Sequence, residues 1–253
     1  MPGPIIIADD DATRTITMRR PEKKNAISHE MFLAMSEAIN SAQSDPAIRC
    51  LILTGRSGVF TSGDDVSDFV NESEAPRDPA RPRGSIIFLR ALVNNKKPII
   101  AAVDGVAAGM GTTMVLHCDY VIAGTTASFF SPLIQYGLGP EGASSLLLPR
   151  IAGYQRAFSL LVMGRAMSAE EARSAGLVNV VVPPGHAIVE AQKAAREICA
   201  LSPEAVAISR KLLKPPTEDL LRRMGQEEHL FAERIRSPSV LAAVKSFLSR
   251  KKR

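Results

Sequence analysis

The chain has 253 residues, 45% of them hydrophobic and 23% charged, and its formal net charge is +5. This size and composition suffice for one substantial core, and no apolar run approaches the length that spans a bilayer. The three cysteines and four histidines are scattered, without the paired spacing of a zinc site or a disulfide framework. We therefore expect no metal site and no membrane insertion.

The net positive charge of the chain is compatible with several classes of binding partner. A basic protein can bind nucleic acid, an anionic surface or a small polyanion. The absence of Trp and the presence of only three Tyr disfavour an aromatic platform for single-stranded nucleic acid. The N-terminus lacks a basic region followed by an apolar stretch, so we expect no signal peptide. We expect a cytoplasmic protein without a nucleic-acid partner, although composition alone does not choose among these classes of partner.

The first half of the chain predicts strands that alternate with helices, as in an α/β fold. An Asp run between two β-forming segments predicts a hairpin over residues 5–18. Ser28 is a candidate N-cap for a helix that Asp45 and Pro46 end. Residues 71–85, rich in Pro and Arg, predict a mobile surface loop. The other expected elements are strands over 50–53, 99–103, 120–123 and 128–130, and helices over 86–93 and 112–117.

From Tyr154 onward the chain predicts mostly helices. Ser168 is a candidate N-cap followed by acidic residues, and Gly176 is a candidate C-cap. One last strand is expected over residues 178–182, before a Pro-Pro stop. The later helices are expected over 186–200, 203–213, 217–235 and 239–249. An α/β core followed by a helical region is the expected organisation.

Eight short motifs occur along nearly the whole chain. They are RPEKKNA at 20–26, GVFTSGDD at 58–65, KPIIAAVDG at 97–105, AAGMG at 107–111, CDYVIA at 118–123, GLGPEG at 137–142, LPR at 148–150 and SAEEA to GLV at 168–178. Each motif alone is weak, but their common order and spacing are specific. In this order the chain resembles the crotonase, or enoyl-CoA hydratase/isomerase, superfamily.

The resemblance implies an α/β fold, a crotonase-like spiral of ββα turns with a C-terminal helical subdomain. Residues 1–195 would form the spiral core, and residues 196–253 a C-terminal helical trimerisation region. It also implies a homotrimer, or a hexamer built as a dimer of trimers. The shared chemistry is stabilisation of an enolate formed from an acyl-CoA thioester. Coenzyme A would be part of the substrate, so no separate cofactor is expected.

An enolate needs fixed hydrogen-bond donors where its negative charge develops. By the family motif, the donors would be the backbone N–H groups of Asp64 and Met110, beside the substrate-binding residues Gly63 and Gly109. Small residues let the backbone approach the substrate closely. The alternative is that both glycine-containing stretches are ordinary turns.

The acid and base groups depart from the hydratase pattern. Hydratases of this family carry two glutamates, and Thr113 and Leu133 occupy the corresponding positions here. Glu141 is retained, at the position where isomerases of the family often place a single base. One carboxylate suffices to move a proton from C2 to C4 of a 3-enoyl-CoA. The alternative for Glu141 is an acid in the first turn of a helix.

The resemblance also implies residues that bind the substrate. Lys24 and Ala26 match positions near the nucleotide, and Phe247 and Arg250 match a family tail that reaches a CoA phosphate. The alternative for this basic tail is a solvated or nuclear-import-like segment. The remaining candidates for substrate contact are Asp65, Leu133 and Leu138, with Phe129 as a further wall of an apolar pocket.

Three functions remain open at this point. The leading one is an enoyl-CoA isomerase that shifts a double bond from position 3 to position 2. The second is an enoyl-CoA hydratase, or another lyase or hydrolase of the same superfamily. The third is a non-catalytic acyl-CoA-binding or RNA-associated protein, although no RNA-recognition motif supports the RNA version.

Overall fold

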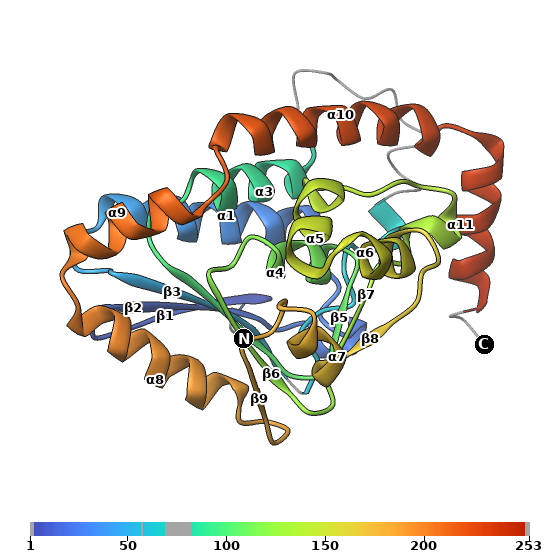
Figure 1. Cartoon of the computed structure of the whole chain (residues 1–253). Coiled ribbons are helices and arrows are strands. Elements are labelled where there is room, and N and C mark those ends of the chain that lie inside the picture. The colour runs from blue at the N-terminus through green and yellow to red at the C-terminus, as the bar shows by residue number, and fades with distance from the viewer. Residues whose placement is uncertain (1–2, 57, 69–81, 251–253) are drawn as a thin grey trace.

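The computed structural model describes residues 3–56, 58–68 and 82–250, without the side chains of residues 247, 248 and 250. Its strands form two sheets, and helices cover them (Figure 1). The strands are β1 (Ile5–Asp10), β2 (Thr13–Met18), β3 (Cys50–Gly55), β4 (Ile99–Val103), β5 (Val106–Ala108), β6 (Tyr120–Gly124), β7 (Ser128–Phe130), β8 (Met167–Ser168) and β9 (Val180–Val182). The predicted α/β organisation is confirmed.

The larger sheet has six strands in the order β1-β2-β3-β4-β6-β9. The strands β1 and β2 form the predicted antiparallel hairpin, and Asp11 adopts the left-handed conformation in its turn, with φ of 48°. All the other neighbours in this sheet are parallel. Parallel strands are covered on both faces, which explains the continuous apolar runs in the sequence.

The two faces of the larger sheet belong to two separate apolar clusters. Leu51 and Leu53 of β3 face the main core, where the helices α1 (His29–Ser44) and α3 (Gly84–Asn94) pack. Cys50 and Ile52 of the same strand face a second cluster with Ala191 and its neighbours on the helix α8 (Ala187–Ala200). The alternation follows from the two-residue period of a strand. Figure 1 shows α8 on one side of the sheet and α1 and α3 on the other.

The smaller sheet has three short strands in the order β5-β7-β8. The strands β5 and β8, and the helix α5 described below, are additional to the elements predicted from the sequence. The strands β5 and β8 carry too little pattern to be read from the sequence, although β7, which also has only three residues, was predicted. The loop before Gly63 joins β5 through an isolated bridge between Thr61 and Ala107. This second sheet therefore ties two distant glycine-containing loops together.

Helices follow the predicted segments closely. In the first part of the chain they are η1 (Pro21–Lys23), α1 (His29–Ser44), α3 (Gly84–Asn94), α4 (Met110–Val115), η2 (Leu133–Tyr136), α5 (Ser144–Ala152) and α6 (Tyr154–Leu161). In the last part they are α7 (Ala169–Ser174), α8 (Ala187–Ala200), α9 (Pro203–Leu213), α10 (Thr217–Ile235) and α11 (Pro238–Arg250). The predicted caps at Ser28 and Ser168 are confirmed, the latter as a reciprocal capping box with Glu171. The helix α4 begins at Met110, two residues earlier than predicted.

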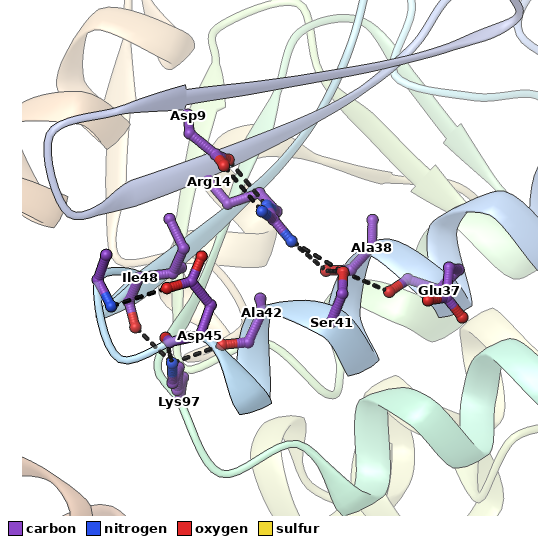
Figure 2. A network of polar contacts seen from close by, with 10 residues as sticks. Asp9, Arg14, Glu37, Ala38, Ser41, Ala42, Asp45, Ile48 and Lys97 are labelled. Atoms are coloured by element: carbon purple, nitrogen blue, oxygen red, sulfur yellow. Dashed lines mark hydrogen bonds and ion pairs between the residues drawn. The ribbon is translucent and has the colours of Figure 1, made fainter.

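The carboxyl end of α1 is closed by a lysine from a neighbouring loop. The ammonium group of Lys97 donates to the backbone oxygens of Ala42, Asp45 and Ile48 at 2.5, 2.6 and 2.5 Å. Figure 2 shows these three bonds meeting at one nitrogen. Cations are favoured at a helix C-terminus, where carbonyl groups lack intrahelical donors. Lys97 thus fixes the C-terminal end of α1 against the start of β4, the strand that follows Lys97 in the sequence.

The C-terminal helices pack on the rest of the chain. The helix α10 lies along α3 and also contacts α5, and α11 packs against η2 (Figure 1). The predicted boundary at residue 195 falls inside α8, whose apolar face covers the sheet. Among the described residues, no helix combines the length and apolar character needed to cross a bilayer. Trimerisation through residues 196–253 stays a prediction.

Candidate functional site

The two loops predicted to carry the backbone donors lie against each other. Thr61 N–H donates to Val106 O at 2.9 Å, and Ala108 N–H donates to Thr61 O at 3.0 Å. A Cβ atom placed on Gly63 would stand 2.7 Å from Ala108 O and 3.5 Å from Met110 N. Gly63 also has φ of 87°, a conformation that favours glycine. Only a residue without a side chain lets these loops approach so closely.

The backbone N–H groups of Met110 and Asp64 occupy distinct positions in this arrangement. Met110 is the first residue of α4, so its N–H has no intrahelical acceptor. Gly109 before it has φ of 51° and ψ of −116°, which only glycine adopts readily. Ile27 N–H donates to Gly63 O and Asp65 N–H donates to Ile27 O, both at 2.9 Å. In such a parallel bridge the N–H of Asp64 points away from Ile27.

The segment that contains Lys24 and Ala26 is organised by the residue between them. The buried Asn25 side chain accepts from Arg20 N–H at 2.8 Å and donates to Val59 O at 2.7 Å. The backbone carbonyl oxygen of Asn25 accepts a hydrogen bond from the Thr61 hydroxyl at 2.6 Å. Lys24 is exposed, whereas the Ala26 side chain is buried. Asn25 was not singled out from the sequence, although it lies inside the first motif.

Asp65, predicted to contact the substrate, is engaged within the protein. Its carboxylate accepts from Arg20 at 2.8 Å and from the Ser67 hydroxyl at 2.6 Å. Burial would raise the pKa of Asp65, but the hydrogen bonds from Ser67 and Arg20 outweigh burial and lower the pKa. Asp65 therefore joins the loop after Gly63 to Arg20, at the start of the first motif.

Glu141 is almost fully buried, with 2% of its surface exposed. It lies two residues before Ala143, the N-cap of α5, so the alternative of a first-turn helix acid is wrong. Gly142 and Ala143 both adopt the left-handed conformation, with φ of 65° and 59°. A Cβ atom on Gly142 would stand 2.5 Å from the Thr113 methyl carbon and 3.0 Å from two Leu89 carbons. The chain after Glu141 is thus pressed against α4 and α3.

Two buried polar side chains hold this same backbone. His117, at the end of α4, has its Nε2 2.7 Å from Gly142 O. Glu227, on α10, accepts from Ala143 N–H at 2.6 Å and from Ser145 N–H at 3.1 Å. The Ser145 hydroxyl also donates to Glu227, at 2.5 Å. The short segment beside Glu141 is therefore bonded from both sides by groups distant in sequence.

Burial is the largest influence on the pKa values of both His117 and Glu227. Burial lowers the pKa of His117 to about 4, and the nearby charge of Lys214 acts in the same direction. A neutral imidazole must carry its hydrogen on Nε2 to donate to a carbonyl oxygen. Burial raises the pKa of Glu227, whereas the hydrogen bonds from Ser145 and Ala143 and the charge of Arg223 act against this rise.

Glu227 was not predicted as a functional residue, but the sequence holds a signal for it. The buried positions of α10 follow a helical spacing of three or four residues. They are Leu220, Met224, Glu227, Phe231 and Ile235. A carboxylate on an otherwise apolar helix face needs buried donors to offset its desolvation. The signal therefore indicated an internal partner, although it could not name that partner.

Two of the three residues predicted to line an apolar pocket lie in a cluster separate from the main core. Leu133 and Leu138 are buried together with residues of α10 and α11, among them Phe231 and Val240. Phe129 is buried in the main core instead. The Arg83 guanidinium carbon lies 4.0 Å from the centre of the Phe231 ring, a cation–π contact. The side chains of Phe247 and Arg250 lie outside the described part of the structure.

Within the described residues, no group of three or more His, Cys, Asp or Glu is arranged to hold a metal ion.

A cavity of about 660 Å³ lies between α9 and α5, bordered by Leu147 and Leu213, and touches none of the predicted site residues. A cavity of about 520 Å³ is bordered by Pro140, Ser145 and Glu227, beside the Glu141 segment. The second cavity thus adjoins the Glu141 segment through Pro140 and Ser145, whereas His117 borders the first cavity.

Comparison with known proteins gives consistent matches over the whole chain. The family model described as enoyl-CoA hydratase/isomerase matches residues 10–253. Enoyl-CoA delta isomerase 3, peroxisomal, of Mus musculus is 30% identical over 250 residues, which cover 98% of this chain and 78% of that protein. Enoyl-CoA hydratase EchA19 of Mycobacterium tuberculosis is 38% identical over 199 residues, 77% of this chain and 74% of that protein. The solved structure of OdaA from Pseudomonas aeruginosa is 38% identical, has a TM-score of 0.90 and covers 96% of this chain and 98% of its own.

Proposed function

Because the chain belongs to the enoyl-CoA hydratase/isomerase family, we propose that it moves a double bond from position 3 to position 2 of an enoyl-CoA. The observation that carries this proposal is the burial of the Glu141 carboxylate, which has 2% of its surface exposed. The two positions expected to carry glutamates in a hydratase hold Thr113 and Leu133. Thr113 contributes a methyl group that packs beside Gly142.

In the proposed reaction Glu141 takes a proton from C2 of a 3-enoyl-CoA. The negative charge spreads onto the thioester oxygen, which accepts hydrogen bonds from the N–H groups of Asp64 and Met110. Glu141 then returns the proton at C4, so that the double bond lies between C2 and C3. Loss of one such fixed donor costs roughly 100- to 1000-fold in rate in other enzymes. The close approach of the Gly63 and Met110 loops supports this use of both amides.

Several residues would serve binding. Lys24 is exposed near the loop of Ser62, whose N–H donates to Lys24 O at 3.0 Å, and so could meet the nucleotide part of CoA. The apolar cluster around Leu133 and Leu138 supports an acyl pocket on the side of α10 and α11. Phe247 and Arg250 are proposed CoA contacts on the basis of the family tail alone.

The decisive test is Glu141→Gln, assayed by conversion of a 3-enoyl-CoA to its 2-enoyl isomer. The amide keeps the size of the side chain but cannot accept the proton, so we expect activity to fall by at least about 1000-fold. Glu170→Gln, at an exposed site on α7, is the matched control and should retain full activity. Substantial isomerisation by the Glu141 variant would rule Glu141 out as the base.

A hydratase is the second candidate, favoured by the 38% identity to the hydratase relative. Addition of water benefits from one group that activates water and another that handles the proton at C2. We expect little loss of the conjugated thioester absorbance when the protein is given crotonyl-CoA. Rapid hydration would contradict the isomerase assignment and leave the family assignment intact.

We also propose that the protein is a homotrimer or a dimer of trimers. The helix α9 supports this because it exposes Ile208, Leu212 and Leu213, an unusual amount of apolar surface for one short helix. A cytoplasmic location stays a prediction from the sequence.

A further inference from the structure

The amino end of α5 lacks a capping side chain of its own. Its N-cap is Ala143, and no side chain of the helix start accepts a hydrogen bond there. The first N–H groups of a helix need acceptors, which an Asp or Ser at the N-cap usually supplies. Here the acceptor comes from another helix, because the Glu227 carboxylate takes up the N–H groups of Ala143 and Ser145. Glu227 thus caps α5 from α10.

The hydrogen bonds around Glu227 form a small network in which the Glu227 carboxylate is the acceptor of each bond that it makes. The Ser145 hydroxyl donates to Glu227 Oε1 at 2.5 Å and accepts from Arg223 Nη1 at 3.3 Å. Both carboxylate oxygens accept, one from Ala143 and the other from Ser145. A glutamine at position 227 has only one acceptor oxygen and would turn its NH2 group toward the other backbone N–H, so it cannot keep both backbone bonds. The arrangement is specific for a carboxylate.

The segment held in this way adjoins Glu141 directly. Gly142 and Ala143 both have positive φ, and the backbone has no room to shift toward Thr113 or Leu89. His117 is a second buried side chain bonded to this segment, through Gly142 O. Rigid support of this kind fixes the Cα position of Glu141 and the direction in which its side chain leaves the backbone.

We infer that Glu227 is a positioning residue that aims the Glu141 carboxylate through the Ala143–Ser145 backbone. This inference rests on the proposed function of Glu141 as the base. Moving a proton between C2 and C4 requires one carboxylate to reach two carbons, so small errors of placement are costly. A displacement of about 1 Å can lower a rate by about 100-fold. The C-terminal helix α10 would then take part in catalysis as well as in packing.

The experiment compares Glu227→Gln with the wild-type protein in the isomerase assay. We expect kcat to fall by about 100-fold while KM stays within about threefold, because the Glu227 carboxylate is already engaged by Ala143 and Ser145. Binding of a saturated acyl-CoA, measured by calorimetry, should be unchanged within the same factor. Glu233→Gln makes the same chemical change at an exposed ion pair on α10 and should leave all three values unchanged.

A second variant covers the case in which Glu227→Gln does not fold. Ser145→Ala removes one donor to Glu227 and keeps both backbone donors, so we expect a fall in kcat of about tenfold with unchanged KM. Wild-type kcat in either folded variant would overturn the inference. A parallel rise in KM and in the acyl-CoA dissociation constant would also overturn it, because that pattern indicates general loosening of the site.

The proposed function and this inference can fail separately. Full isomerisation by Glu141→Gln would remove the base and the reason to position it. Loss of activity in Glu141→Gln with normal activity in Glu227→Gln would leave the base in place and refute the positioning role alone. If Glu227 acts through Glu141, the double variant should bind the saturated acyl-CoA as tightly as Glu141→Gln.

Discussion

The direction of the Glu141 side chain depends on residues far from it in the sequence. Ala143 N–H and its acceptor Glu227 are 84 residues apart, and the pair of His117 and Gly142 spans 25 residues. Neither Glu227 nor His117 needs to touch a substrate to affect the reaction. At this scale, buried polar groups fix a backbone in which Gly142 and Ala143 both adopt the left-handed conformation.

His117 makes the stability of the protein depend on pH. Its pKa is lowered from 6.5 to about 4 by burial. Below pH 6.5 the unfolded chain takes up a proton that the folded chain does not bind until about pH 4. The stabilisation is therefore fully present above pH 6.5 and is lost as the pH falls toward 4, by about 2 kcal/mol at pH 5.

The measurement is the free energy of unfolding in urea at pH 8 and pH 5, for the wild type and for His117→Gln. Glutamine can donate to Gly142 O but does not titrate. Between pH 8 and pH 5 the variant should therefore lose about 2 kcal/mol less free energy of unfolding than the wild type. The opposite contribution of Glu227, whose pKa is raised, is common to both proteins and cancels. Equal losses in the two proteins would show that His117 does not titrate as expected.

At the scale of elements, side chains close the ends of helices across loops. Lys97 closes α1, and Glu227 caps α5 from α10. Asp119, just before β6, accepts from Ile99 N–H at 2.8 Å and pairs with Arg210 of α9 at 2.8 Å. These contacts bind the helical region to the parallel sheet. Figure 2 shows a further example beside Lys97, where Arg14 joins Asp9 of β1 to Ser41 of α1.

Replacement of Lys97 by methionine should destabilise the fold. Methionine keeps most of the aliphatic stem but removes the ammonium donor from three backbone oxygens, of which Ala42 O and Asp45 O each keep one backbone N–H donor. We expect a loss of about 3 kcal/mol, measured by urea unfolding at neutral pH. Lys96→Met, at an exposed neighbour, should change the stability by less than about 0.5 kcal/mol. Similar losses in the two variants would contradict the helix-closing role of Lys97.

For the whole molecule, the two most exposed large apolar side chains of the described residues lie on α9. Leu212 and Leu213 are 80% and 84% exposed, and Leu213 borders the cavity between α9 and α5. Residues of this kind are typical of an interface between chains. The same helix is fixed to the core by Arg210 and Lys214, which both pair with Asp119. A rigid apolar helix is well suited to assembly.

Leu213→Asp should therefore dissociate the assembly. A carboxylate at the centre of an apolar interface is desolvated without a partner, which costs several kcal/mol for each copy. Sedimentation velocity should show three or six chains for the wild type and a single chain for the variant. Val189→Asp, an exposed site on α8, is the control and should keep the wild-type mass. A wild type that sediments as one chain would contradict the trimer proposal itself.

The sequence by itself determined the elements and the family. The hairpin over 5–18, the buried strands such as 99–103, and the four last helices were predicted because their residues carry a clear periodicity or a clear stop signal. The motif order was enough to identify the superfamily and to single out Glu141. These features depend on local sequence, which is why they could be read without coordinates.

Only the tertiary structure decided how these parts meet. The strands β5 and β8 are too short to show a pattern, and they exist because neighbouring strands pair with them. The approach of Gly63 to Met110 and the capping of Ala143 by Glu227 join segments far apart in the chain. Such contacts are fixed by packing of the whole core rather than by local preference. Glu141 was therefore visible in the sequence, but the groups that hold it in place were not.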